Sequence, residues 1–187
     1  MGNRTGTYVA FDGLGESNPT MSDFKYYATL QAWSANKDIK FNLIDSHDKT
    51  YSIRDDSKNS TFKSRINERL SMSKNIIVIL TENTRKGRNE SWLSYEIEQA
   101  CDVYKLPFII CYPEYNSILN PRLLLNKWPH VLKECISNGN IKAIHIPFNK
   151  NAIFDAIDQF SIVGVKYPKS STSYYTRKAQ ESFGIKF

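Results

Sequence analysis

The 187-residue chain has few cysteines and no long apolar segment. Its three cysteines, Cys101, Cys111 and Cys135, show neither CxxC nor CxxH spacing, so the sequence predicts no disulfide framework and no metal site, as in a reducing cytoplasm. The longest apolar runs are about half a dozen residues, far short of the ~20 that span a bilayer. The N-terminus lacks the apolar core of a signal peptide. We therefore expect a cytoplasmic protein without a membrane partner.

The excess of basic residues is concentrated near the C-terminus. Lys and Arg number 25 against 19 acidic residues, a formal net charge of +6. Residues 161–187 contain five cations and one acid, Glu181, so this segment carries +4 and leaves only +2 for the rest. That remainder is too small to predict a surface that tracks phosphates, and nucleic acid is not an expected partner. We expect one domain over residues 1–160 and a basic C-terminal extension over residues 161–187 that lacks a clear period.

Short segments rich in β-branched and aromatic residues recur every 31 to 36 residues, the size of a strand, a crossover helix and two loops. The five segments are Thr7–Phe11, Ile39–Ile44, Asn75–Leu80, Leu106–Tyr112 and Lys142–Pro147. The third and fourth are continuous apolar runs, which is typical of strands covered on both faces. The segments between them have helical periodicity. The alternation predicts an α/β fold with a five-stranded parallel sheet and helices on both faces.

Polar residues that favour helix N-caps precede most of the predicted helices. Ser22 or Asp23, Ser60 or Thr61, and Asn149 or Asn151 begin three of them, Asn89 to Tyr104 forms another, and a short one lies near Trp128. In such sheets ligands bind beyond the carboxyl ends of the strands, where the strand order switches. The loops of interest are therefore 11–22, 45–60, 81–91 and 112–120.

Several common catalytic motifs are missing. The first strand is followed by only two glycines instead of GxGxxG, and neither a P-loop nor a GxSxG elbow occurs. His47, His130 and His145 lie on three separate segments without metal-ligand spacing. His145 falls within the last predicted strand, where a hydrogen-bonded core histidine is the expected role.

Two polar segments remain as candidates for a functional site. The loop from Asp45 to Asp48, with His47, follows the second strand and reads either as a turn with a helix cap or as a ligand loop. Trp92 and Glu96 are i and i+4 neighbours on the flank of a helical apolar stripe, facing neither the deep core nor open water. Glu96 is either a solvated boundary residue beside a packing Trp or a site carboxylate.

The stretch RINERLSMSKNIIVILTENTRKGRNESWLSYEIEQA, residues 65–100, resembles the middle of a TIR domain. The family pattern is an amphipathic helix, an apolar strand, a polar loop and a W-x-x-x-E helix, which Trp92 and Glu96 match. The segments YVAFDG, DSHD and RDDS, with the helix carrying Trp33, are similar to one bacterial branch, the TIR-like ThsB subunits of Thoeris antiphage systems. The resemblance covers roughly residues 5–160.

The resemblance implies a flavodoxin-like sheet of order 2-1-3-4-5 and cleavage of NAD⁺ at the nicotinamide–ribose bond. Glu96 corresponds to the family's catalytic glutamate, and Trp92 would support it or border the site. The residues that would line the dinucleotide site are Phe11, Asp12, Asp45 and His47. NAD⁺ would be the substrate, and no further cofactor or metal is implied.

One carboxylate suffices for this chemistry. Glycosidases need a second carboxyl group to protonate a poor leaving oxygen, but nicotinamide leaves NAD⁺ as a neutral base. The remaining task is to stabilise the positive charge that develops on the ribose, which a fixed carboxylate does preferentially in the transition state. Water would then give ADP-ribose, a ribose hydroxyl of the same molecule a cyclic isomer, and another nucleophile a conjugate.

The resemblance also implies partners. The product would act as a signal on a separate effector protein, a phage component would be the trigger, and the active form would be a homo-oligomer. The main alternative is a non-catalytic TIR-like adaptor that binds another protein through residues 45–60. A flavodoxin-like phosphoryl receiver is a weaker alternative, because Asp12 is not followed by the further carboxylates that a metal would need.

Overall fold

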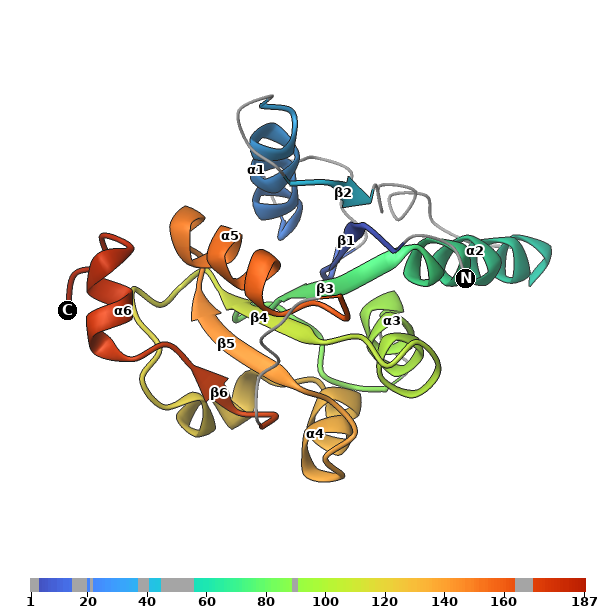
Figure 1. The fold of residues 1–187 in the computed structure, drawn as a ribbon. Coiled ribbons are helices and arrows are strands. Elements are labelled where there is room, and N and C mark those ends of the chain that lie inside the picture. Colours follow the sequence, from blue (N-terminus) through green and yellow to red (C-terminus); the bar gives the residue numbers. More distant parts are fainter. Residues whose placement is uncertain are drawn as a thin grey trace.

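The chain folds as a parallel sheet with helices on both faces (Figure 1). The computed structural model describes residues 4–14, 20, 22–36, 41–44, 56–88, 91–163 and 170–187. The predicted α/β, flavodoxin-like class is confirmed.

The sheet contains six strands in the order β2-β1-β3-β4-β5-β6, all paired in parallel. They are β1 (Gly6–Ala10), β2 (Leu43–Ile44), β3 (Ser73–Ile79), β4 (Phe108–Tyr112), β5 (Ala143–Pro147) and β6 (Ser173–Tyr174). The order predicted for the first five strands is confirmed. β3 and β4 are buried along almost their whole length, as their apolar runs indicate.

The prediction of five strands is wrong, because the C-terminal extension supplies a sixth. β6 pairs with β5 through Ile144 opposite Ser173 and His145 opposite Tyr174. The ring of His145 donates from Nε2 to the carbonyl of Ser171 at 3.1 Å, since a carbonyl can only accept. A two-residue strand is too short to produce a hydrophobic period, so sequence patterning misses it.

His145 is the hydrogen-bonded core histidine that the sequence predicts. Its Nδ1 accepts from the hydroxyl of Tyr112 at 2.7 Å, and that hydroxyl accepts from the indole nitrogen of Trp128 at 2.8 Å. Burial lowers the pKa of His145 to about 4, so the ring is neutral at physiological pH. The three side chains form a buried polar network between β4, β5 and the extension.

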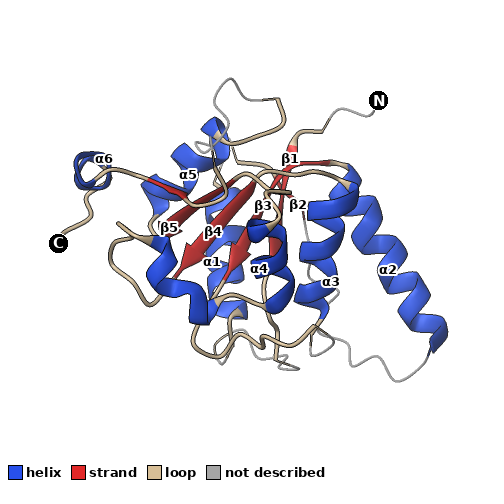
Figure 2. Ribbon diagram, turned by 90° about the horizontal axis from the view of Figure 1, so that it is seen from below, coloured by secondary structure: helices blue, strands red, loops and turns tan. Residues whose placement is uncertain are grey.

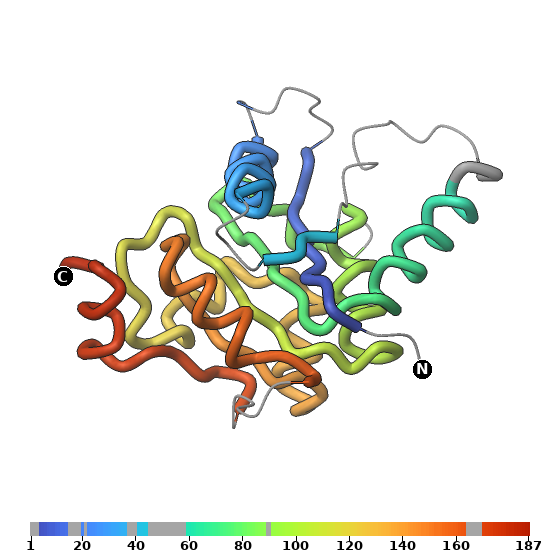
Figure 3. Tube along the Cα trace, turned by 45° about the horizontal axis from the view of Figure 1, so that its top comes forward, coloured from blue at the N-terminus to red at the C-terminus, as the bar shows by residue number. Residues whose placement is uncertain are grey.

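The end of the extension forms a further helix, α6 (Arg177–Ser182), which packs at the edge beyond β5 (Figure 3). The buried amide of Gln180 accepts from the backbone N–H of Ile118 at 3.1 Å and donates to its carbonyl at 2.8 Å. The same amide donates to the carbonyl of Tyr175 at 2.8 Å. The extension is therefore joined by hydrogen bonds to the loop that follows β4.

Two hydrophobic layers cover the sheet. On one face lie α2 (Asp56–Ser71), α3 (Trp92–Glu98) with the π-helical turn Gln99–Val103, and α4 (His130–Ser137) (Figure 2). On the other face lie α1 (Phe24–Ser34) and α5 (Lys150–Gln159). A 3₁₀ segment, Pro121–Lys127, precedes α4.

The helix starts agree with the sequence in two places and differ in one. α1 follows Asp23, and α5 follows Asn149, whose side chain accepts from the N–H of Ala152 at 3.1 Å. α2 begins at Asp56, so the prediction that Ser60 or Thr61 caps it is wrong. Both residues are exposed within the helix, where a hydroxyl costs little because it stays hydrated.

All three cysteines are buried and unpaired by disulfides. Among the described residues, no helix combines the length and the apolar character that crossing a bilayer requires.

Candidate functional site

The carboxyl ends of β1 and β3 form the switch point of the sheet. The chain leaves β1 toward α1 on one face and leaves β3 toward α3 on the other, so the loops diverge between two neighbouring strands. The described parts of these loops, residues 11–14 and 80–88, contain most of the polar contacts described below.

Asp12 and Arg85 join the two loops across the switch point. The guanidinium of Arg85 donates to the Asp12 carboxylate from Nη2 at 2.6 Å and from Nε at 2.9 Å, and the Arg85 backbone N–H adds a contact of 2.9 Å. Leu14 donates its N–H at 3.1 Å. Burial alone would raise the pKa of Asp12, but the hydrogen bonds from Arg85 and Leu14 outweigh it and lower the pKa. The carboxylate is therefore ionised and held in place.

A second buried carboxylate, Asp23, lies before α1. The hydroxyl of Thr81, just after β3, donates to both Asp23 oxygens at 2.9 and 3.0 Å. Burial, with the negative charges of Asp12 and Glu114, raises the pKa of Asp23 to about 6, although the Thr81 bond opposes the shift. Asp12, Asp23 and Glu114 thus lie close enough at this edge for their charges to interact.

Glu96 lies deeper than the sequence predicts. Its side chain is fully buried, and the hydroxyl of Tyr8 in β1 donates a hydrogen bond to its carboxylate. The predicted position on the flank of the apolar stripe is therefore wrong. Glu96 is adjacent to the buried residue Ile97 on the helix. The burial of its carboxylate depends on Tyr8 in β1, a partner that the periodicity of α3 alone cannot predict.

Trp92 has the intermediate position that the sequence predicts. Its ring meets Phe62 of α2 edge-on at a centroid distance of 4.6 Å and Tyr95 at 6.1 Å. Tyr95 in turn accepts a hydrogen bond from Asn67 at 3.0 Å. Trp92 therefore holds α3 against α2 and also forms part of a cavity wall.

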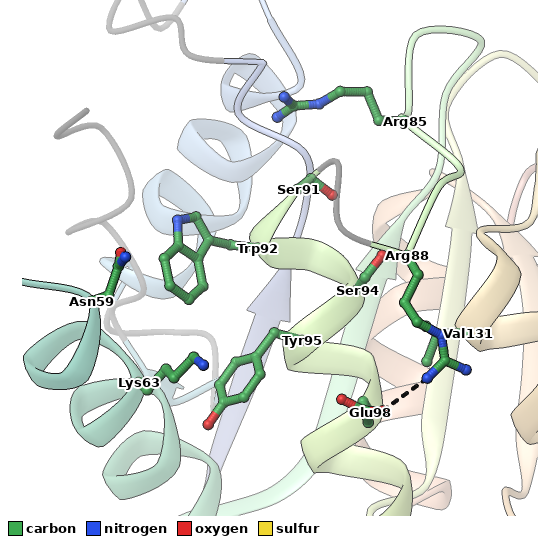
Figure 4. A pocket seen from close by; sticks show the side chains of 10 residues that line it. All are labelled: Asn59, Lys63, Arg85, Arg88, Ser91, Trp92, Ser94, Tyr95, Glu98 and Val131. Atoms are coloured by element: carbon green, nitrogen blue, oxygen red, sulfur yellow. Dashed lines mark hydrogen bonds and ion pairs between the residues drawn. The ribbon is translucent and has the colours of Figure 1, made fainter. Parts of the chain in front are cut away.

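A cavity of about 840 Å³ opens between α2, α3, α4 and the loop after β3 (Figure 4). Its lining is largely polar: Asn59, Lys63, Arg85, Arg88, Ser91, Trp92, Ser94, Tyr95, Glu98 and Val131. The carboxylate that lines it is Glu98 rather than Glu96. Three of the lining side chains are cationic, Lys63, Arg85 and Arg88, and the two arginines are paired with carboxylates.

Arg88 connects α3 and α4 through ion pairs at the wall of the cavity. Its guanidinium lies 3.4 Å from the carboxylate of Glu98 on α3, the contact drawn in Figure 4, and also pairs with Glu134 on α4. On the opposite side the ammonium of Lys63 lies 5.3 Å from the ring centre of Tyr95. Basic side chains from α2 and from the loop after β3 thus lie on two sides of α3 (Figure 4).

The structure separates the other predicted site residues. Phe11 stacks on Tyr27 at 5.1 Å and belongs to the core on the opposite face of the sheet from Glu96. Asp12 is connected to the cavity through Arg85, which lines it. Asp45 and His47 lie outside the described residues.

Three residues that line the cavity or contact Glu96 are not predicted from the sequence: Arg85, Arg88 and Tyr8. Arg85 and Arg88 belong to the run TRKGR in the loop expected to bind ligand, so that basic run was an available signal. Tyr8 gives no signal, because a tyrosine within an apolar strand looks like an ordinary core residue. Within the described part of the chain, the one group of potential metal ligands, Cys101, Asp102 and Cys135, does not line the cavity.

Comparison with known families agrees with this arrangement. Residues 8–118 match the family model described as the TIR-like domain of the Thoeris protein ThsB. The match covers β1 through the loop after β4, and so includes Asp12, Arg85, Trp92 and Glu96.

Proposed function

The chain belongs to the TIR-like domain family of Thoeris ThsB proteins, and on that premise we propose that it cleaves NAD⁺ at the nicotinamide–ribose bond, with Glu96 as the catalytic carboxylate. The observation that carries the proposal is the W-x-x-x-E helix at the switch point. Trp92 lines an open cavity there, and Glu96, one turn further along the same helix, is a carboxylate buried against β1.

The cavity suits the non-reacting part of a dinucleotide. Its volume of about 840 Å³ lies within the ~300–1,000 Å³ typical of small-molecule sites. Lys63, Arg85 and Arg88 line it, and although the two arginines are paired with carboxylates, a guanidinium has five N–H donors and can bind a phosphate through two of them. The rings of Trp92 and Tyr95 offer flat apolar surface beside these charges.

The reaction requires little from the protein besides a fixed negative charge. The bond between the ribose carbon and the nicotinamide nitrogen breaks, its electron pair leaves with neutral nicotinamide, and positive charge develops on the ribose. A Glu96 carboxylate that accepts hydrogen bonds from ribose hydroxyls stabilises that charge more than it stabilises the ground state. A nucleophile then attacks the ribosyl cation.

Under this proposal the described conformation, in which Glu96 is buried, is a resting one. The Glu96 carboxylate has no solvent exposure and accepts from the Tyr8 hydroxyl. Catalysis therefore requires a conformation in which ribose hydroxyls replace Tyr8 at the carboxylate. A dependence on assembly or on a phage-derived trigger agrees with such a closed state, because uncontrolled NAD⁺ loss would harm the cell.

The proposed product is an ADP-ribose-derived signal, either a cyclic isomer or a conjugate, or ADP-ribose itself. It would be made in the cytoplasm by a homo-oligomer and would activate a separate effector protein in antiphage defence. A site closed to water would favour cyclisation or conjugation over hydrolysis.

The full burial of Glu96 also favours a second candidate, a TIR-like adaptor without catalytic activity. In that case the Tyr8–Glu96 contact would serve only to join β1 to α3. The cavity, which Lys63, Arg85 and Arg88 line, would then bind an acidic segment of a partner protein instead of a dinucleotide.

Nicotinamide release separates the two candidates. The purified full chain is incubated at high concentration with NAD⁺, alone and with lysate from phage-infected cells, and products are identified by mass spectrometry. The enzyme proposal predicts nicotinamide together with an ADP-ribose-derived product. The same lysate without the added chain should not form that product. No nicotinamide above the lysate background in either condition would contradict it and support the adaptor.

A further inference from the structure

Two cysteines and an aspartate converge away from the cavity. Cys101 and Asp102 come from the π-helical turn after α3, and Cys135 comes from α4. One side-chain ligand atom from each of the three lies within 4.8 Å of the other two. Both thiols are buried, whereas Asp102 is exposed, so the group reaches from the core to the surface.

The π-helical turn brings the ligands together. Its wider hydrogen bonding is seen in the contact from the N–H of Tyr104 to the carbonyl of Gln99 at 3.0 Å, five residues earlier. π-helical turns are rare in proteins, and those that do occur are often found at functional sites. This turn places the sulfur of Cys101 3.3 Å from a carboxylate oxygen of Asp102, and the amide of Asn140 lies 3.5 Å from the same oxygen.

Simple packing accounts for only part of this arrangement. A buried cysteine often acts as a small apolar residue, and Cys111 in β4 shows that role among apolar neighbours of the sheet. Cys101 and Cys135 differ because each has another thiol beside it and because a surface carboxylate closes the group. Thiolate sulfur and carboxylate oxygen are both ligands of Zn²⁺, a cation of borderline softness.

We propose that Cys101, Asp102 and Cys135 bind a divalent cation of the zinc class through two thiolates and one carboxylate. The exposed side of Asp102 leaves the fourth coordination position to water. The sequence predicts no metal site, because the two cysteines are far apart in the chain and only the packing of α4 against α3 brings them together.

Metal binding at this group would release protons. A metal ion replaces the proton on each thiol that becomes a ligand. The affinity is therefore expected to fall as the pH is lowered.

The site would join two walls of the cavity. Cys101 continues the helix that carries Trp92 and Glu96, and Cys135 lies one turn beyond Val131, which lines the cavity. A bound ion would fix α4 to the end of that helix, and a ligand that binds only the folded state stabilises it by RT ln(1 + [L]/Kd).

The test is a Co²⁺ titration of the purified full chain in a reductant that contains no thiol. The expected result is a sulfur-to-cobalt charge-transfer band that saturates at one equivalent and disappears when Zn²⁺ is added. Zn²⁺ should also raise the Tm of the chain. Asp102→Asn, at an exposed position, should fold normally and weaken Co²⁺ binding by at least about 10-fold, since even outer-shell partners are worth about 10- to 100-fold.

Cysteine variants complete the test. Cys101→Ala and Cys135→Ala should abolish the band, whereas Cys111→Ala, a matched buried cysteine in β4, should leave it unchanged. The proposal is overturned if no band forms, if the band survives Asp102→Asn and Cys101→Ala undiminished, or if the reduced chain binds no metal and Cys101 and Cys135 are recovered only as a disulfide.

Discussion

The hydroxyl of Tyr8 in β1 donates a hydrogen bond to the buried carboxylate of Glu96 in α3. This contact joins the first strand to the helix that carries the proposed catalytic group. The burial of Tyr8 is the largest cause that raises the pKa of this hydroxyl well above its usual value, and the nearby Glu96 carboxylate raises it further. Tyr8 is therefore protonated at neutral pH and remains a donor.

A double-mutant cycle measures this contact. Tyr8→Phe removes the donor and Glu96→Leu removes the acceptor, so each leaves the other buried polar group without this partner and should lower the free energy of unfolding by about 1–3 kcal/mol. Because the two groups contact each other, the double variant should lose less than the sum, with a coupling energy of about 1–3 kcal/mol. Urea denaturation checks this. Tyr174→Phe, at an exposed position, should change stability by less than about 0.5 kcal/mol. Strict additivity of the two changes would contradict the contact.

Asp12→Asn tests the bond across the switch point. It should destabilise the chain by about 1–3 kcal/mol at pH 7, because Arg85 then faces a neutral amide, although the partial exposure of Arg85 limits the loss. The folded-state pKa of Asp12 is below the unfolded value of 3.8, so its contribution is complete above that value and is lost as the pH falls through the folded pKa. Unfolding free energies from about pH 3 to pH 7 check this. A difference between wild type and variant that does not begin to shrink as the pH falls below 3.8 would contradict it.

Asp23→Asn should act in the opposite direction. The folded-state pKa of Asp23 is about 6, above the unfolded value of 3.8, so its charged form costs stability above pH 6 and that cost disappears as the pH falls toward 3.8. An asparagine keeps an acceptor for Thr81 without the charge. The variant should therefore be more stable than wild type by on the order of 1–3 kcal/mol at pH 7.5, with a smaller gain at pH 5. A variant that is less stable at both pH values would show that the charge is favourable.

Gln180 tests whether the C-terminal extension is part of the fold. Gln180→Ala leaves the backbone N–H and carbonyl of Ile118 without their partner and should cost about 1–3 kcal/mol. Gln180→Glu should cost more, because a carboxylate oxygen would face two carbonyls. Lys178→Ala, at an exposed position on the same helix, serves as the control in thermal unfolding. Equal Tm values for all three variants would show that the extension is dispensable.

The sequence allows most of the fold to be predicted, because its main signals are strong and local. Apolar runs at regular spacing identify the first five strands, and Asp23 and Asn149 mark two helix starts. The extension escapes prediction because β6 has only two residues and α6 is held largely through the polar residue Gln180. Neither feature produces a hydrophobic period.

The candidate site is less predictable, since it depends on contacts between elements. The W-x-x-x-E spacing identifies Trp92 and Glu96, and the switch-point rule identifies the loop that contains Arg85. The burial of Glu96 depends on Tyr8, which is far away in the chain. The likeness to TIR domains adds the expected chemistry, which residue patterns alone do not provide.

Nicotinamide release by Glu96→Gln shows whether the Glu96 carboxylate is the catalytic group. Wild type, Glu96→Gln, Glu98→Gln and Glu68→Gln are compared under the condition that activates the wild type, with Tm values to confirm folding. Glu68 is an exposed acid on α2 outside the cavity lining and serves as the matched control. The account predicts a loss of at least about 10²-fold for Glu96→Gln and a normal rate for Glu68→Gln. A wild-type rate for a folded Glu96→Gln variant, above all with a loss in Glu98→Gln, would contradict it.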